Sequence, residues 1–134
     1  MSASFADSNV VLYTASPDER RADIALELID EGLVISVQVL NEAANVMRRK
    51  WKRTWPETQR LIDGLRSQCI IVPVDETTHD LGIDIAMRYK LSIYDSMIVA
   101  AALLAHCDTL YTEHMHPGLV IEGRLRIVNP FSAP

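Results

Sequence analysis

The sequence lacks the short motifs that identify many enzyme classes. None of its five glycines belongs to a GxGxxG or GxxxxGK[ST] pattern, so neither a dinucleotide-binding loop nor a P-loop is expected. The patterns GxSxG and HExxH are also absent, which argues against an α/β-hydrolase and a zinc metalloprotease. Any chemistry must therefore rest on side chains that are scattered along the chain.

Cysteine and long apolar runs are scarce as well. Cys69 and Cys107 form no CxxC pair and are expected to be reduced core residues rather than a disulfide. The first seven residues lack the basic and apolar regions of a signal peptide. The apolar run 97–105 has nine residues, about half of what a membrane span needs. These features predict a soluble, cytoplasmic protein with no membrane partner.

Positive charge is in the minority. The net charge is −5, so nucleic-acid binding would need a local basic patch or a bridging metal ion. The most basic stretch is 48–53, and such a run is more often a solvated face than an RNA-binding patch. The 134 residues are 49% hydrophobic and contain no repeat or linker, which predicts one globular domain over residues 1–134.

Short apolar segments alternate with segments of helical periodicity. Strands are expected from residue 5 and at 33–36, 69–72, 109–112 and 125–129. Helices are expected to begin at Ser16, Val37, Thr54, Asp75 or Thr77, and Ser92. The helix that begins at Ser92 is apolar on all sides and should be buried. This alternation predicts an α/β fold with a mainly parallel sheet and helices on both faces.

Acidic and polar residues stand near the expected strand ends. Asp7 follows the first strand, Thr112 ends the fourth, Glu42 follows the second by about one and a half turns, and Asp95 lies near a helix start. Ligands of parallel sheets bind beyond the carboxyl ends of the strands. Clustered carboxylates suit Mg²⁺ or Mn²⁺ held partly by water and substrate phosphate. Such a site could serve phosphodiester cleavage.

Each of these residues also has a purely structural interpretation. Asp7 could form a turn, and Glu42 could be a solvated helix residue. Asp95 could complete a capping box with Ser92, a role that can coexist with metal binding. His114, in the loop after the fourth strand, is more commonly a loop residue than a metal ligand. No single position is specific.

Five segments taken together carry a resemblance. They are DSNVVLY (7–13), SVQVLNE (36–42), LSIYDSMIVAAA (91–102), CDTLYTE (107–113) and RLRIVNPF (124–131). In this order they resemble the PIN-domain ribonucleases, and most closely the VapC-type toxins of bacterial toxin–antitoxin pairs. The resemblance covers nearly the whole chain and implies a PIN-like three-layer fold. It also implies a Mg²⁺- or Mn²⁺-dependent endoribonuclease that cleaves RNA through a metal-activated water.

The resemblance further implies roles for individual residues and partners. The implied catalytic metal ligands are Asp7, Glu42 and Asp95, and the implied supporting residues are Asn9, Ser36 and Thr112. Such toxins usually form homodimers and are blocked by a small antitoxin protein that covers the acidic groove. Arg49 is expected on the same side of its helix as Glu42. Possible contacts to RNA or antitoxin are Arg48, Arg49, Lys50, Lys52 and Arg53.

One position departs from the family pattern. The family typically has Thr-x-Asp after the fourth strand, whereas this chain has Thr112-Glu113-His114. Imidazole is a poor Mg²⁺ ligand but an acceptable Mn²⁺ ligand. Glu113 is adjacent, although an offset of one residue normally points a side chain elsewhere. Three alternatives follow: weakened binding of a second metal ion, a preference for Mn²⁺, or a catalytically weakened module that binds antitoxin or RNA without efficient cleavage.

Overall fold

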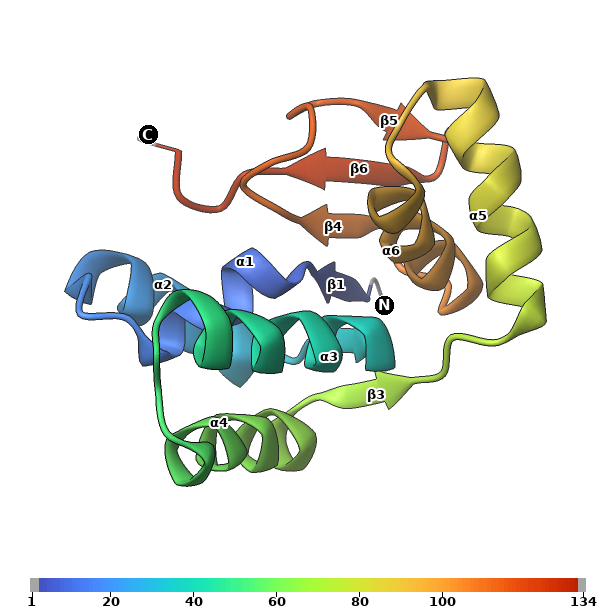
Figure 1. The fold of residues 1–134 in the computed structure, drawn as a ribbon. Helices are drawn as coiled ribbons and strands as arrows, with labels where there is room; N and C mark the ends of the chain where they lie inside the picture. Colours follow the sequence, from blue (N-terminus) through green and yellow to red (C-terminus); the bar gives the residue numbers. More distant parts are fainter. Residues whose placement is uncertain (1–2, 133–134) are drawn as a thin grey trace.

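A six-stranded sheet with the strand order β3-β2-β1-β4-β6-β5 forms the centre of the molecule (Figure 1). The computed structural model describes residues 3–132, so the predicted domain span of 1–134 extends beyond it by two residues at each end. The strands are β1 (Ser4–Ala6), β2 (Val34–Ser36), β3 (Ile70–Val72), β4 (Thr109–Tyr111), β5 (Val120–Ile121) and β6 (Leu125–Val128). Only β5 pairs in the antiparallel sense within the described residues.

Helices lie on both faces of this sheet (Figure 1). They are α1 (Ser8–Val11), α2 (Glu19–Glu31), α3 (Val37–Asn45), α4 (Trp55–Gln68), α5 (Glu76–Tyr89) and α6 (Ile93–Leu104). A 3₁₀ turn, Leu12–Ala15, follows α1, and a π-helical turn, Val46–Lys50, follows α3. The predicted three-layer α/β fold with a mainly parallel sheet is therefore confirmed.

Side-chain caps fix most of the helix starts that the sequence predicts. Thr54 and Glu57 form a reciprocal capping box at α4, and Asp75 caps α5. The Ser92 hydroxyl accepts a hydrogen bond from the Asp95 backbone N–H at 3.2 Å. The predicted start at Ser16 is wrong, because Asp18 caps α2 by accepting from the Arg21 N–H at 3.2 Å. A carboxylate next to the positive helix end competes successfully with the hydroxyl two residues earlier.

The core is built around the middle of the sheet and α6. Phe5 and Leu110, on the neighbouring strands β1 and β4, have no exposed surface, and α6 is buried continuously from Ser96 to Leu103. The expectation of a buried helix is thus confirmed. Cys69 and Cys107 are buried and unpaired, as predicted.

Four elements were not predicted from the sequence: helix α1, the 3₁₀ turn Leu12–Ala15, strand β5 and the π-helical turn Val46–Lys50. Strand β5 has two residues and pairs only along β6, so it has too few residues to show an alternating pattern. The π-helical turn at the end of α3 has the same apolar spacing as an ordinary helix over so short a length. Within residues 3–132, no helix combines the length and hydrophobicity required to cross a membrane.

Candidate active site

A cavity of about 420 Å³ opens at the carboxyl edge of the sheet. Its wall includes the three carboxylates that the sequence singled out: Asp7, Glu42 and Asp95. Asp7 directly follows β1, Glu42 lies on α3 and Asp95 lies in the first turn of α6. The parallel register of the strands explains why these residues lie near one another. The last residues of the strands pair at the same edge of the sheet, Ala6 with Tyr111 and Ser36 with Val72.

Asp7 is buried and held on both carboxylate oxygens. Its side chain is 5% exposed, Oδ1 accepts from the Ser8 N–H at 2.7 Å, and Oδ2 accepts from the Thr112 hydroxyl at 3.0 Å. Burial raises the pKa of Asp7, and the negative charge of Asp95 adds to this effect, whereas the hydrogen bonds oppose it. Asp7 is therefore a rigid carboxylate whose negative charge would be stabilised by a cation.

Glu42 is half-buried and is oriented by two neighbours. The Ser8 hydroxyl donates to Oε1 at 3.2 Å and the Gln38 amide donates to Oε2 at 3.3 Å. The same Gln38 amide donates to the Tyr94 carbonyl at 2.9 Å, which links α3 to the first turn of α6. Burial raises the pKa of Glu42, and the charge of Asp7 raises it further. The two carboxylates therefore repel each other across the cavity.

Asp95 differs from the other two carboxylates in being unrestrained. Its backbone N–H is capped by Ser92, but its carboxylate accepts no hydrogen bond from residues 3–132. Only one half of the capping box considered for Ser92 and Asp95 is therefore present. The Asp95 N–H donates to the Ser92 hydroxyl, but the Asp95 carboxylate does not accept from the Ser92 backbone. The half-buried carboxylate lines the cavity and remains available to a ligand.

The polar residues around Asp7 form a brace between α1 and the loop after β4. Thr112, which is fully buried, also accepts from the Asn9 amide at 3.4 Å and from the His114 N–H at 3.3 Å. Asn9 in turn accepts from the Glu113 N–H at 2.9 Å. Ser36 lies elsewhere: its buried hydroxyl caps α3 by accepting from the Val39 N–H at 3.3 Å.

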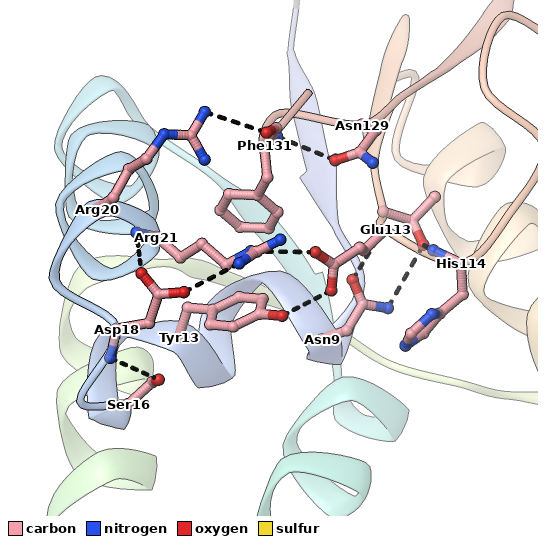
Figure 2. A network of polar contacts seen from close by, with 11 residues as sticks. Asn9, Tyr13, Ser16, Asp18, Arg20, Arg21, Glu113, His114, Asn129 and Phe131 are labelled. Atoms are coloured by element: carbon pink, nitrogen blue, oxygen red, sulfur yellow. Dashed lines mark hydrogen bonds and ion pairs between the residues drawn. The ribbon is translucent and has the colours of Figure 1, made fainter. Parts of the chain in front are cut away.

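Glu113 is held by a second network at the edge of the cavity. Tyr13 donates its hydroxyl to Oε1 at 2.7 Å, and Arg21 donates from Nε to Oε2 at 3.2 Å. Figure 2 shows both side chains converging on the Glu113 carboxylate, while the His114 ring points away from it. His114 lines the cavity and is exposed. His114 thus contributes an imidazole to the cavity wall, at the sequence position where the resemblance implies a fourth acid.

Comparison with known proteins identifies the family. The PIN domain family model matches residues 4–114. The chain belongs to the PIN domain family. The resemblance drawn from the five sequence segments is therefore confirmed. No curated protein sequence matches the chain significantly.

Solved structures share this PIN fold at low sequence identity. A toxin–antitoxin complex from Klebsiella pneumoniae contains a chain with a TM-score of 0.73 and 23% identity, covering 98% of this chain and 100% of that one. VapC20 of Mycobacterium tuberculosis, a Sarcin-Ricin loop cleaving toxin, has a TM-score of 0.65 and 13% identity, and the match covers 81% of this chain and 87% of that one. DNA-bound VapBC from Salmonella typhimurium contains a chain with a TM-score of 0.66 and 18% identity, and the match covers 95% of this chain and 97% of that one. These likenesses establish the fold.

The donor set of this PIN domain suits a hard cation, but the donors are not gathered around one point. Carboxylate oxygens are the ligands that Mg²⁺ and Mn²⁺ prefer. Burial is the main cause of the raised pKa values of Asp7 and Glu42, and repulsion from neighbouring carboxylates adds to it. Within residues 3–132, however, no three His, Cys, Asp or Glu side chains are close enough to hold one ion. The residues therefore fit an ion whose remaining ligands are water and substrate phosphate.

The predicted basic contacts of the PIN domain separate into different environments. Arg48 donates to the Arg53 carbonyl and lies over the Trp55 ring at 4.3 Å, and Arg53 pairs with Glu57. Arg49 was expected on the Glu42 side, but it lines a different hollow, beside Trp55. The π-helical turn is the cause, because its wider turn takes an extra residue. Lys50, not Arg49, lines the cavity, and Lys52 adopts a left-handed backbone with φ of 54°.

Several residues of the site were missed by sequence reasoning. Ser8 and Gln38 orient Glu42, Tyr13 and Arg21 hold Glu113, and Trp51 forms part of the cavity wall. Gln38 had a usable pattern, since it precedes Glu42 by four residues on the same helical face. Arg21 and Glu113 are 92 residues apart, and nothing local to either residue indicates that they pair.

Proposed function

We propose that this PIN domain is the toxin of a toxin–antitoxin pair, acting in the cytoplasm as a Mg²⁺- or Mn²⁺-dependent endoribonuclease. The carrying observation is the cavity at the sheet edge, whose wall contains Asp7, Glu42 and Asp95 in a chain of this family. Fold likeness to toxins such as VapC20 supports RNA as the substrate class. Lys50 on the same wall offers a cation to a phosphate.

The chain's own residues would divide the work of the site. Asp7 is fixed by Ser8 and Thr112 and provides a rigid ligand, Glu42 is held by Ser8 and Gln38, and Asp95 is free to turn toward an ion. A bound divalent ion would supply activation of water and charge stabilisation at the phosphodiester. The raised pKa values of Asp7 and Glu42 mean that acidic pH would protonate them earlier than ordinary carboxylates and weaken ion binding.

The test is cleavage of a structured RNA with Mg²⁺ or Mn²⁺ by the wild type and three variants. Asp7→Ala and Asp95→Asn should each lose at least about tenfold in rate, since even outer-shell partners of metal ligands cost 10–100-fold. Asp80→Asn is the matched control, because it removes an exposed carboxylate outside the cavity wall. Equal cleavage by all four proteins would show that the activity comes from another site or a contaminant.

A second function is favoured by the state of Glu113 and His114. The Glu113 carboxylate accepts hydrogen bonds from Tyr13 and Arg21. The exposed His114 imidazole lines the cavity beside it. The alternative is a module that binds RNA or antitoxin without efficient cleavage. His114→Asp decides between the two functions: a variant that cleaves where the wild type does not favours the binding module. Efficient cleavage by the wild type removes this alternative.

The proposed partners are a cognate antitoxin and a second copy of the chain. Structural relatives include toxin–antitoxin complexes, which supports the first. Exposed apolar side chains on α5 and at the start of α6, such as Met87 at 69% and Tyr94 at 70%, support burial of surface in an assembly. A purified chain that sediments at the monomer mass at all accessible concentrations would contradict the homodimer.

A further inference from the structure

We propose that Trp51 and Lys50 form a nucleotide subsite in the active-site cavity, where an unpaired base stacks on the Trp51 indole and its phosphate contacts Lys50. The inference rests on the proposed function, because it takes RNA as the substrate. It goes further by naming the residues of this chain that would hold an unpaired nucleotide of that RNA. It also assigns a binding role to an aromatic residue outside the acidic cluster.

The π-helical turn places both residues on the cavity wall. In a regular α-helix Arg49 would follow Glu42 and Asn45 along one side. In the structure, the Trp51 N–H donates to the Val46 carbonyl at 2.9 Å, five residues earlier. The extra residue in the turn moves Lys50 and Trp51 to the cavity and Arg49 away from it. π-Helical turns are rare and often occur at functional sites.

Trp51 both packs against the protein and borders the cavity. It is half-buried against a small apolar cluster formed by Leu12, Ala43 and Met47, and it also lines the cavity. The next residue, Lys52, reverses the chain in a left-handed conformation with φ of 54°. The Arg53 N–H then donates to the Met47 carbonyl at 2.8 Å. An aromatic ring held in this way loses little entropy when a base stacks on it.

Lys50 supplies a cation that has no salt-bridge partner within residues 3–132. Arg48 and Arg53 are engaged within their own segment, whereas Lys50 is exposed and makes no salt bridge among residues 3–132. An aromatic face beside a free cation is the arrangement by which proteins bind single-stranded nucleic acid. A base within a duplex is already stacked on both faces and cannot offer one to Trp51. The cavity volume of about 420 Å³ is within the range of small-ligand sites, about 300–1,000 Å³.

Fluorescence gives a direct test, because the chain has two tryptophans. Trp55→Phe leaves Trp51 as the single emitter, and Trp51→Phe leaves Trp55, which is 64% exposed and outside this cavity. Each variant is titrated with a mixed-sequence single-stranded RNA of ten nucleotides and with the matching duplex. The titrations are made in EDTA, and again with Mg²⁺ in an Asp95→Asn background to prevent cleavage. We expect the single strand to quench Trp51 and leave Trp55 unchanged, and the duplex to quench neither.

Affinity measured by anisotropy of labelled RNA provides the second readout. Trp51→Leu should weaken binding of the single strand by roughly tenfold or more, while Trp51→Phe should retain most of it, because the smaller ring still stacks. Lys50→Gln should reduce the slope of log K against log salt concentration by about 0.7, the value for one phosphate contact on a single strand. Lys90→Gln, an exposed lysine at the end of α5, should leave the slope unchanged. Thermal melts of the variants identify any loss of folding.

The outcomes separate this subsite from the proposed function. Quenching of Trp51 by single-stranded RNA without cleavage by the wild type supports the subsite and overturns the ribonuclease. Cleavage by the wild type with no quenching of Trp51 under either condition overturns the subsite and leaves the ribonuclease in place. Equal quenching by single strand and duplex also overturns the subsite, because it would show contact with the phosphate backbone alone.

Discussion

Asp7 combines two demands that oppose each other. The metal-ligand role proposed for Asp7 requires a charged carboxylate, yet its position in the fold removes it from water and places it near Asp95 and Glu42. Hydrogen bonds from Ser8 and Thr112 offset part of the free-energy cost of burying the charged carboxylate. The net effect is a raised pKa. A functional carboxylate of this kind lowers the stability of the metal-free fold, a common trade between activity and stability.

Asp7→Asn should therefore stabilise the metal-free protein at neutral pH while abolishing cleavage. Because the folded-state pKa of Asp7 is raised, ionisation opposes folding above that pKa, and this opposition disappears as the pH falls toward the ordinary Asp value. The stability difference between variant and wild type should accordingly shrink as the pH is lowered through that window. Urea titrations in EDTA at several pH values measure it. A variant less stable than the wild type at pH 7 would contradict the prediction.

At the scale of elements, helix ends and turns decide what reaches the cavity. The cap of α6 at Ser92 positions Asp95, the cap of α3 at Ser36 sets the start of the helix that carries Glu42, and the π-helical turn brings in Lys50 and Trp51. The chain then reverses and begins α4 with the Thr54–Glu57 capping box. The geometry of the site thus depends on local backbone features outside the carboxylates themselves.

Thr54→Ala should lower the free energy of unfolding by about 1 kcal/mol, the usual cost of losing an N-cap side chain. The lost bonds are those of the Thr54 hydroxyl with Glu57 at 3.0 and 3.2 Å. Thr54→Ser retains the hydroxyl and should lie within a few tenths of a kcal/mol of the wild type. Chemical denaturation of the three proteins measures the difference. Identical stabilities for the alanine and serine variants would show that the Thr54 hydroxyl contributes nothing.

For the whole molecule, the fold concentrates negative charge at one edge of the sheet. Under the proposed function, the net charge of −5 and the mutual repulsion of the three cavity carboxylates should make the folded state bind divalent cations better than the unfolded chain. Binding to the folded state alone raises stability by mass action, by about 2.7 kcal/mol when the ion concentration is 100 times Kd. Stability should therefore report binding independently of RNA cleavage.

Mg²⁺ or Mn²⁺ should raise the melting temperature of the wild type, and Asp95→Asn should reduce this gain. The comparison is made against NaCl at equal ionic strength, because ordinary salt also screens repulsion among the carboxylates. Scanning calorimetry over a range of ion concentrations gives the apparent affinity. A larger gain with Mn²⁺ than with Mg²⁺ that His114→Ala removes would show that His114 participates, since imidazole suits Mn²⁺ better. Equal gains with NaCl and the divalent salts would contradict specific binding.

The sequence by itself determined the fold class and the three cavity carboxylates. Buried strands and amphipathic helices follow from the local order of apolar residues, and residues after parallel strands must meet at one edge. Asp7, Glu42 and Asp95 could be named because each has a fixed place relative to a strand end or a helix start. The family resemblance joined them, and the match of the PIN model over residues 4–114 agrees with it.

Only the tertiary structure decided which side chains are free and which are occupied. Glu113 is taken by Tyr13 and Arg21, approximately 100 residues away along the chain, and this pairing has no local sequence pattern. The π-helical turn exchanged Arg49 for Lys50 at the cavity, because one additional residue in a turn rotates everything that follows it. Periodicity fixes where elements run, whereas long-range contacts and small departures from ideal helical geometry fix where their side chains point.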